Sequence, residues 1–212
     1  MDGTSDLKGT GSIDSIEALR AIYPAAKERS LLKQLDRLDP VCRQFIGMAP
    51  FCVIASGGAA GDLDASPRGG APGFIRVLDD HTVLVPDALG NNRLDTLTNV
   101  IETGRIGMIF FVPGVDETLR INGTARLRND PALLGQFSGE RHPPRAVIEV
   151  RVKDAYLHCA KALMRSKLWD PATRVARSVL PSMSQMIQAQ TGGKLPHVET
   201  QEEMLQRYAK EL

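Results

Sequence analysis

Cysteine, net charge and long hydrophobic runs are all scarce in this sequence, and each scarcity narrows what the protein can be. Three cysteines occur in 212 residues, at the widely separated positions Cys42, Cys52 and Cys159. This spacing argues against a disulfide framework and a cysteine-based metal site, and the four histidines are equally scattered. We therefore expect no metal, and we expect the cysteines to be small buried residues with reduced thiols.

The charge balance and the hydropathy pattern exclude further classes of protein. Lys and Arg number 26 and Asp and Glu number 25, so the formal net charge is +1. Such a balance lacks the electrostatic footprint of a nucleic-acid binder. No apolar stretch approaches the roughly 18 residues that span a membrane. The polar N-terminus also lacks the apolar core of a secretion signal, so we expect a cytoplasmic protein.

What is present is the composition of a folded domain. Hydrophobic residues make up 42% of the chain and charged residues 24%, and 212 residues suffice to bury a sizeable core. We expect a mobile tail over residues 1–12, followed by a single domain over 13–212. Within this domain the sequence predicts N-terminal helices (13–48), a barrel (49–158) and a helical extension (159–212).

Apolar residues at helical spacing mark the N-terminal helices. One helix is predicted from Ile13 to Pro24, and a second over Ala26–Leu38, where a stripe of leucines repeats at helical spacing. Pro40 interrupts the pattern, and a short turn is expected over Val41–Ile46. We expect the apolar stripes to pack in the core.

The middle of the chain has the character of an antiparallel β-protein. Segments rich in β-branched and aromatic residues, bounded by Gly, Pro or Asp, predict strands over 51–56, 74–78, 82–86, 105–112, 117–127 and 146–153. Because most links have hairpin length, the fold class is mainly β within α+β, a six-stranded antiparallel barrel with flanking helices. Gly123 falls on the apolar side of its strand, where a bulge or a closely approaching backbone is expected. Further helices are predicted near 131–137, 159–167, 181–190 and 199–212.

The string SPRGG offers the first candidate binding residues. Pro67 restricts the backbone before Arg68, and Gly69-Gly70 would let a ligand approach without side-chain collisions. Arg68 would bind a phosphate, with Ser66 donating a hydroxyl. The alternative is an ordinary surface turn with a solvated arginine.

The string VPDALGNNRLDTL offers the second set. A helix is predicted to follow, ending at Gly104, and Asn91 or Asn92 would cap its start. Arg93 would lie in the first turn, where a cation opposes the helix dipole unless an anionic ligand binds there. The alternative is an ion pair between Arg93 and a carboxylate, Asp87 or Asp95. Taken together, we interpret the two segments as the phosphate grip of a flavin mononucleotide (FMN) site.

These segments also carry a family resemblance. The strings DASPRGGAPGF, VPDALGNNRLDTL, FFVPGVDETLRINGTARL and KALMRSKLWDP resemble the FMN-binding split-barrel superfamily typified by pyridoxamine 5′-phosphate oxidase. They are most similar to its subgroup of FMN-dependent enzymes with no settled substrate. The resemblance spans about residues 25–200. It implies a six-stranded split barrel and a homodimer, with two FMN molecules bound at the subunit interface.

The resemblance assigns positions along the flavin. The family's phosphate-binding arginine corresponds to Arg68, and its Ser-Arg-Lys step at a helix start corresponds to Asn91-Asn92-Arg93. The strand end that runs along the isoalloxazine edge corresponds to Val85, Pro86 and Asp87.

A second block of the family, RSKLWDP, corresponds to Arg165–Pro171. From it Lys167, Leu168 and Trp169 are expected to reach the flavin from the partner chain, and Lys167 is the candidate for stabilising the reduced flavin. The alternative for Trp169 is a partly buried anchor whose indole N–H is satisfied within the chain.

Two departures from the family bear on function. The Asn-Asn-Arg step has one cation fewer than the usual Arg-Lys pair, and the chain continues into further helices without a terminal R-x-H string. Pyridoxamine phosphate is therefore not the expected substrate. The leading hypothesis is an FMN-dependent oxidoreductase acting on a small molecule, and no catalytic residue can be assigned.

Two alternatives to this hypothesis remain. One is a flavin-binding protein without turnover. The other keeps the barrel but uses deazaflavin F420 or haem. Haem would need a histidine ligand, for which His81 and His158 lie near predicted strands, and F420 would need a wider basic groove.

Overall fold

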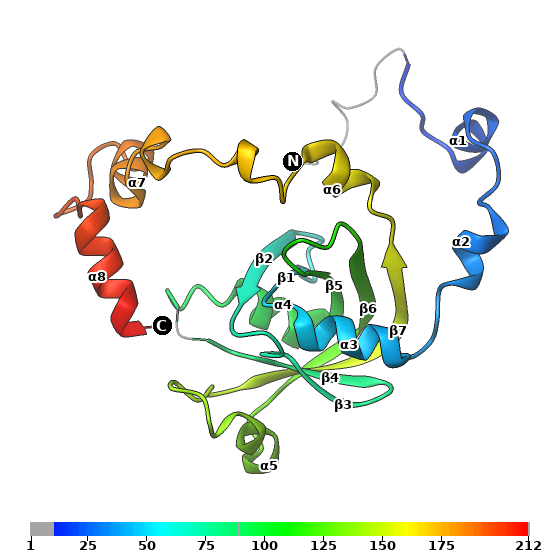
Figure 1. Cartoon of the computed structure of the whole chain (residues 1–212), viewed down its shortest axis with the longest axis horizontal. Helices are drawn as coiled ribbons and strands as arrows, with labels where there is room; N and C mark the ends of the chain where they lie inside the picture. Colours follow the sequence, from blue (N-terminus) through cyan, green and yellow to red (C-terminus); the bar gives the residue numbers. More distant parts are fainter. Residues whose placement is uncertain (1–10, 89, 212) are drawn as a thin grey trace. The chain divides into compact units, whose positions relative to one another are not determined.

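The computed structural model describes residues 11–88 and 90–211, and the contacts within it divide the chain into two units, residues 1–34 and 35–212. The mobile tail expected over residues 1–12 therefore falls outside the described residues except for its last two positions. Figure 1 labels the elements of both units, which are described separately below.

The first unit consists of two short helices, α1 (Ile16–Ile22) and α2 (Glu28–Leu32). The Ser15 hydroxyl caps α1 by accepting a hydrogen bond from the backbone N–H of Ala18 at 3.0 Å. Neither helix buries a residue, and the side chains of Leu31 and Leu32 are 60% and 70% exposed. The expectation of core packing is therefore wrong for α1 and for these two leucines, whereas Leu38, the last leucine of the second stripe, is buried in the core.

The second helix is also shorter than expected. Leu35 has extended backbone and forms an isolated β-bridge with Ala155 through two hydrogen bonds of 2.8 and 3.0 Å. Ladder pairing of this kind is incompatible with helix, so the part of the prediction over Ala26–Leu38 that lies beyond Leu32 is wrong.

The second unit is built around one antiparallel sheet. Its strands are β1 (Phe51–Gly57), β2 (Leu63–Gly69), β3 (Arg76–Asp79), β4 (Thr82–Pro86), β5 (Arg105–Phe111), β6 (Thr118–Arg128) and β7 (Val147–His158). They lie in the order β2-β1-β5-β6-β7-β4-β3. The predicted fold class is confirmed, with seven strands instead of six. The additional strand is β2, which contains the SPRGG string and pairs with β1 along its whole length.

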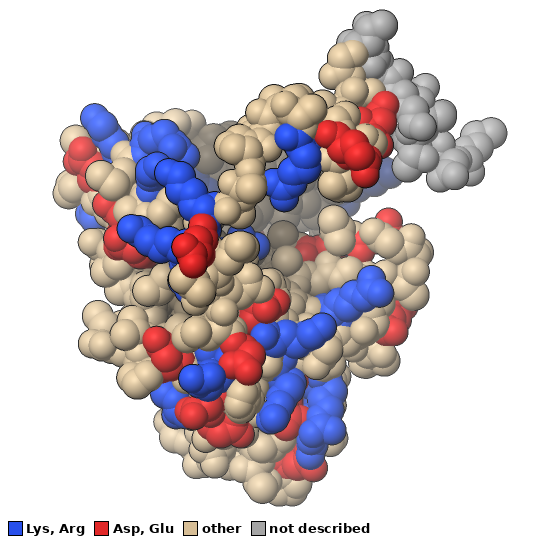
Figure 2. Space-filling view, turned by 90° about the vertical axis from the view of Figure 1, so that its right-hand side faces the viewer, with Lys and Arg blue, Asp and Glu red and all other residues tan. Residues whose placement is uncertain are grey.

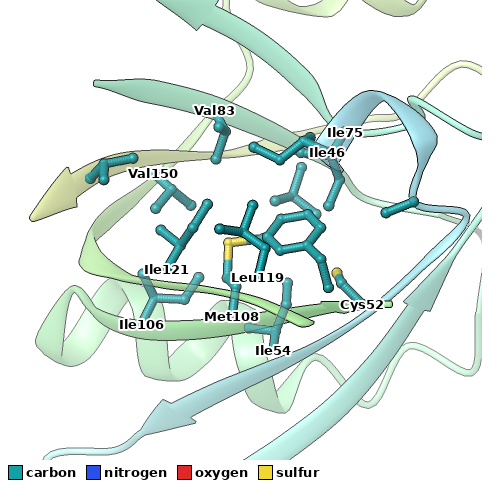
Figure 3. Close-up of a cluster of buried hydrophobic side chains, with 14 of the residues drawn as sticks. Ile46, Cys52, Ile54, Ile75, Val83, Ile106, Met108, Leu119, Ile121 and Val150 are labelled. Carbon is teal, nitrogen blue, oxygen red and sulfur yellow. The ribbon is translucent and has the colours of Figure 1, made fainter. Parts of the chain in front are cut away.

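The second strand from each end of this order, β1 and β4, contributes side chains to one core. Figure 3 shows Ile54 of β1 and Val83 of β4 directed into the same cluster as Ile121 of β6. Ile46 also joins the cluster from α3 (Pro40–Met48), a nine-residue helix where only a short turn was expected. Because strands far apart in the sheet order bury their side chains together, the sheet curls around its interior as a split barrel does.

Gly123 marks an irregularity in the longest strand pair, β6 with β7. The register shifts between Asn122 and Gly123, and a Cβ atom at Gly123 would overlap the carbonyl oxygen of Arg151. Only glycine fits so close an approach. The predicted bulge is confirmed.

Helix α4 (Asp95–Thr103) lies against the first hairpin. Asn99 donates to the Ser56 hydroxyl at 3.0 Å, and Thr103 donates to the carbonyl of Gly57 at 2.7 Å. Gly104 ends the helix as predicted, in the left-handed conformation with φ 63°. These contacts hold the C-terminal half of α4 against the end of β1.

The remaining helices are α5 (Pro131–Leu134), η2 (Gly135–Phe137), α6 (Lys161–Ser166), η3 (Pro171–Thr173), η4 (Arg177–Val179), α7 (Met183–Gln190) and α8 (Gln201–Glu211). The α-helices among them and η2 lie where helices were predicted, and two short 3-10 helices, η3 and η4, were not predicted. In the part of the chain described, none of the helices has both the length and the apolar character needed to cross a bilayer. On the face shown in Figure 2, basic and acidic side chains are interspersed, consistent with the net charge of +1.

The three cysteines differ in how far they are buried. Cys42 and Cys52 are buried as expected, and burial raises the pKa of each thiol to about 12. Cys159 is exposed, so the expectation of burial is wrong for this residue. It directly follows the exposed end of β7.

Candidate functional site

A pocket of about 570 Å³ lies at one edge of the barrel, beside the start of α4. Three separate segments form its walls: residues 66–69 of β2, residues 86–97 with the exception of 89, and residues 141–145 without 144. Phe74 completes the lining. The structure thus brings together the two segments predicted from sequence and adds a third.

Strand β2 supplies the first wall. Asp64, Ser66 and Arg68 alternate with exposed neighbours and are each half-buried, because successive side chains of a strand point to opposite faces. Arg68 donates from Nη2 to the Thr96 hydroxyl at 3.2 Å and from Nη1 to the carbonyl of Pro67 at 2.9 Å. Arg68 is therefore fixed on a strand and does not sit in a surface turn.

The second wall is the loop that enters α4. The helix begins at Asp95, and its N-cap residue, Leu94, makes no side-chain cap hydrogen bond. The Asn91 side chain instead accepts from the backbone N–H of Arg93 at 3.0 Å, which closes a turn before the helix. The prediction that Asn91 or Asn92 caps the helix is therefore wrong. Among the residues described, no side chain caps the backbone N–H groups in the first turn of α4.

The loop that enters α4 also has a strained backbone. Asn92 and Leu94 both have positive φ, at 58° and 61°. Asparagine tolerates this conformation, whereas leucine rarely adopts it. Residues held in such conformations concentrate at functional sites, where surrounding structure compensates their cost.

Arg93 precedes α4 instead of lying in its first turn as predicted. Its Nε donates to the Asp95 carboxylate at 2.5 Å, which is one of the two ion pairs considered from sequence. The Arg93 side chain is 78% exposed, so this pair is weak and readily exchanged.

The third wall, which sequence reasoning missed, contains Arg141, His142 and Arg145. Strand β4 pairs with β7, so Pro86 lies opposite Val147 and the preceding residues come beside the end of β4. The concentration of cationic groups in the string ERHPPR was the available signal. Without the strand pairing, nothing in the sequence connects it to the pocket.

The charges of the pocket are mostly positive. Within the described ranges Arg68, Arg141 and Arg145 form no ion pair, and Arg141 donates to the carbonyl of Ala209 in α8 at 3.4 Å. Burial raises the pKa of Asp87, and nearby Arg68 and Arg145 oppose this shift in part.

The strand end at Val85, Pro86 and Asp87 is divided between core and pocket. Val85 is fully buried in the barrel core, whereas Pro86 and Asp87 line the pocket. The backbone N–H of Asp87 donates to the carbonyl of Ala146 at 3.0 Å, which ties the second wall to the third.

The C-terminal block lies outside the pocket lining. The indole N–H of Trp169 donates to the carbonyl of Val115 at 2.9 Å, so within one chain Trp169 is an anchor with its polar group satisfied. Lys167 ends α6 with φ 51°, and Leu168 is exposed. Contact of these residues with a flavin bound by a partner chain stays a prediction.

Comparison with known proteins identifies the family to which this chain belongs. The family model of pyridoxamine 5′-phosphate oxidase matches residues 38–159 of this chain. A comparison with curated proteins finds no match.

Several solved structures are similar at low identity. An alanine variant of HupZ from Group A Streptococcus is 19% identical and has a TM-score of 0.49; the match covers 57% of this chain and 99% of that one. A protein from Lactobacillus delbrueckii, provisionally named a pyridoxamine 5′-phosphate oxidase, is 16% identical with a TM-score of 0.46 over 58% and 98% of the two chains. The FAD-binding protein from Mycobacterium smegmatis is 15% identical with a TM-score of 0.41 over 58% and 97%.

Proposed function

Because the match over residues 38–159 places this chain in the pyridoxamine 5′-phosphate oxidase family, we propose that its pocket binds FMN and that the protein is an FMN-dependent oxidoreductase. The observation that carries the proposal is the convergence of Arg68 and the uncapped first turn of α4 on one pocket. Backbone N–H groups at a helix N-terminus and a guanidinium together make a phosphate site.

The donors present fit the phosphate of FMN. Arg68 and the α4 N–H groups would hold the phosphate, and the exposed Arg93 would exchange Asp95 for it. Asn91 and Asn92 add amide donors, whereas the Ser66 hydroxyl, which was expected to donate to the phosphate, donates to the Asp64 carboxylate at 3.1 Å instead.

The rest of the cofactor fits the remaining lining. Phe74, Pro86 and Pro143 give apolar surface, and a volume of about 570 Å³ lies within the usual range for small-molecule sites. In a homodimer, Lys167, Leu168 and Trp169 of the partner would complete the site.

Bound FMN supplies hydride or electron transfer at its ring system, and the protein supplies binding, orientation and electrostatics. The proposed substrate is a small molecule. No residue of the chain is assigned as a proton donor or nucleophile.

The visible absorption spectrum of the purified protein, with the released ligand identified by mass, tests the cofactor. We expect the two bands of an oxidised flavin and the mass of FMN, at one FMN per chain after reconstitution. The mass of F420, a Soret band with His142 as the ligand, or a colourless protein that binds no added FMN would overturn the cofactor assignment.

Turnover needs its own test, because a flavin-binding protein without activity would give the same spectrum. We expect the bound flavin to be reduced by NADH or NADPH and reoxidised when an acceptor is added. A bound flavin that neither NADH nor NADPH reduces would indicate a flavin-binding protein without turnover. Elution volume in gel filtration tests the dimer in the same preparation.

A further inference from the structure

We propose that Asp64 and Thr96 are positioning residues for the phosphate grip. They form a chain of hydrogen bonds, called the relay below, that holds the Arg68 guanidinium beside the first turn of α4. The inference rests on the proposed function, since it assigns Arg68 to the phosphate of FMN. Neither Asp64 nor Thr96 belongs to the residues predicted from sequence.

Three hydrogen bonds define the relay. The Thr96 hydroxyl donates to the Asp64 carboxylate at 2.7 Å, and Arg68 donates to the same hydroxyl at 3.2 Å. The Ser66 hydroxyl also donates to Asp64, at 3.1 Å. Asp64 is thus held from two sides.

The chemistry of the groups fixes the direction of each bond. An ionised carboxylate only accepts hydrogen bonds, so the single proton of the Thr96 hydroxyl must point to Asp64. A guanidinium only donates, so it meets the lone pairs that this orientation leaves on the Thr96 oxygen. Asp64 therefore orients Thr96, and Thr96 in turn orients Arg68.

Burial makes this arrangement rigid. Thr96 is 2% exposed, so water has little access to its hydroxyl, which depends on its two protein partners. Thr96 is also the second residue of α4, and its backbone N–H belongs to the uncapped first turn. One residue thereby sets the distance between the strand-borne cation and the helix N–H groups.

The relay leaves Arg68 free to bind an anion. Asp64 and Arg68 make no direct ion pair among the residues described. Thr96 and Pro67 accept two of the N–H groups of the guanidinium, which has five donors. Three donors are left for a phosphate.

Charge repulsion alone predicts that Asp64 weakens FMN binding, whereas the relay predicts that Asp64 strengthens it. A carboxylate near a phosphate site repels the phosphate, so its removal should strengthen FMN binding if charge alone matters. If the relay matters, removal should weaken binding, because Thr96 is then free to rotate and Arg68 loses its orientation. Variants of Asp64 and Thr96 separate the two explanations.

The experiment measures dissociation constants for FMN and for riboflavin, which lacks the phosphate, on the full-length protein. Thr96→Val has nearly the same shape but removes the relay, and Thr96→Ser keeps the hydroxyl. We expect Thr96→Val to weaken FMN binding about tenfold, equivalent to about 1.4 kcal/mol, with riboflavin binding unchanged. Thr96→Ser should restore the preference for FMN over riboflavin.

Asp64 provides the second pair of variants. Asp64→Asn keeps an acceptor for Thr96 and removes the charge, so FMN binding should equal or exceed that of the wild type. Asp64→Ala should weaken FMN binding several-fold. Tighter FMN binding by Asp64→Ala would overturn the relay, as would an unchanged FMN preference in Thr96→Val. If Thr96→Val fails to fold in circular dichroism, the two Asp64 variants decide.

The same data distinguish failure of the relay from failure of the FMN proposal. A wild-type protein that binds neither ligand, or binds both equally well, contradicts the phosphate site itself. A wild type that prefers FMN, combined with variants that keep the full preference, contradicts only the relay.

Discussion

The interior of the barrel and the pocket at its edge belong to one sheet but leave their chemical groups in different states. In the interior, Phe110, Leu119 and Ile121 have no exposed surface, and the sheet pairs their backbone groups. In the pocket, Arg68 and Arg145 have no carboxylate partner within the part of the chain described, and α4 starts without a side-chain cap.

This difference shows how the fold separates stability from binding. Interior side chains are satisfied by one another, so packing there determines whether the protein folds. Pocket groups are left for a ligand, and the positive φ of Leu94 shows that the backbone accepts strain at the same place. For this reason, residues at functional sites are expected to depart from the local conformational and pairing preferences that hold elsewhere in a protein.

The largest effect is expected in the interior. Phe110→Ala should lower the free energy of unfolding by about 3–5 kcal/mol, because it opens a cavity in a closely packed core. Phe51→Ala is the matched control, since Phe51 is 40% exposed and pairs with Phe111 at a ring distance of 5.9 Å. Urea unfolding at fixed protein concentration measures both. Equal losses in the two variants would contradict the division between interior and edge.

An intermediate effect is expected in the pocket, on binding and not on folding. Arg68→Ala should weaken FMN binding roughly tenfold to hundredfold, as expected for the loss of charge-assisted hydrogen bonds. Arg93→Ala should weaken it only a few-fold, because Arg93 is exposed and must first leave Asp95. The unfolding midpoint of the ligand-free protein should hardly change in either variant.

Isothermal titration with FMN measures this difference. A larger loss in Arg93→Ala than in Arg68→Ala would mean that the exposed loop, and not the strand, carries the phosphate site.

The smallest effect is expected at Asp87, where the pocket meets the barrel. Burial raises the pKa of this carboxyl above its usual value of 3.8, so the folded protein binds the proton more tightly than the unfolded chain does. This contribution to stability is complete at acidic pH and is lost as the pH rises through the folded-state pKa.

Asp87→Asn removes this dependence. The variant should be more stable than the wild type at neutral pH, and the difference should vanish as the pH falls below the usual aspartate range. Urea unfolding between acidic and neutral pH checks the trend. A variant that is less stable than the wild type at neutral pH would mean that Asp87 gains more from Arg68 and Arg145 than burial costs it.

Much of the barrel could be predicted because its signals are local. Segments rich in β-branched and aromatic residues between turn residues marked six strands, and Gly123 and Gly104 marked a bulge and a helix end, each through the backbone geometry that glycine permits. The strand β2 was missed as a strand because Pro67 and Gly69 disfavour a ladder. Its position at the edge of the sheet tolerates both.

The pocket could be predicted only in part. Arg68 and the residues 91–93 were found because their types suit a phosphate and because the family resemblance places them there. Arg141 and Arg145 were missed because only the pairing of β4 with β7 brings them to the site. The role of Thr96 was hidden for a similar reason, since a threonine in a helix shows no sign of its partners on a distant strand.

The sequence by itself determined the elements, the class of the fold and the chemical types available for binding, because periodicity, turn residues and charge are properties of neighbours along the chain. Only the tertiary structure decided which of those groups meet. Strand pairing and the packing of α4 join segments that are up to about eighty residues apart, and a pocket is a property of that joining. For the same reason, the exposed leucines of α2 were predicted to lie in the core. Periodicity identifies an apolar face but not what covers it.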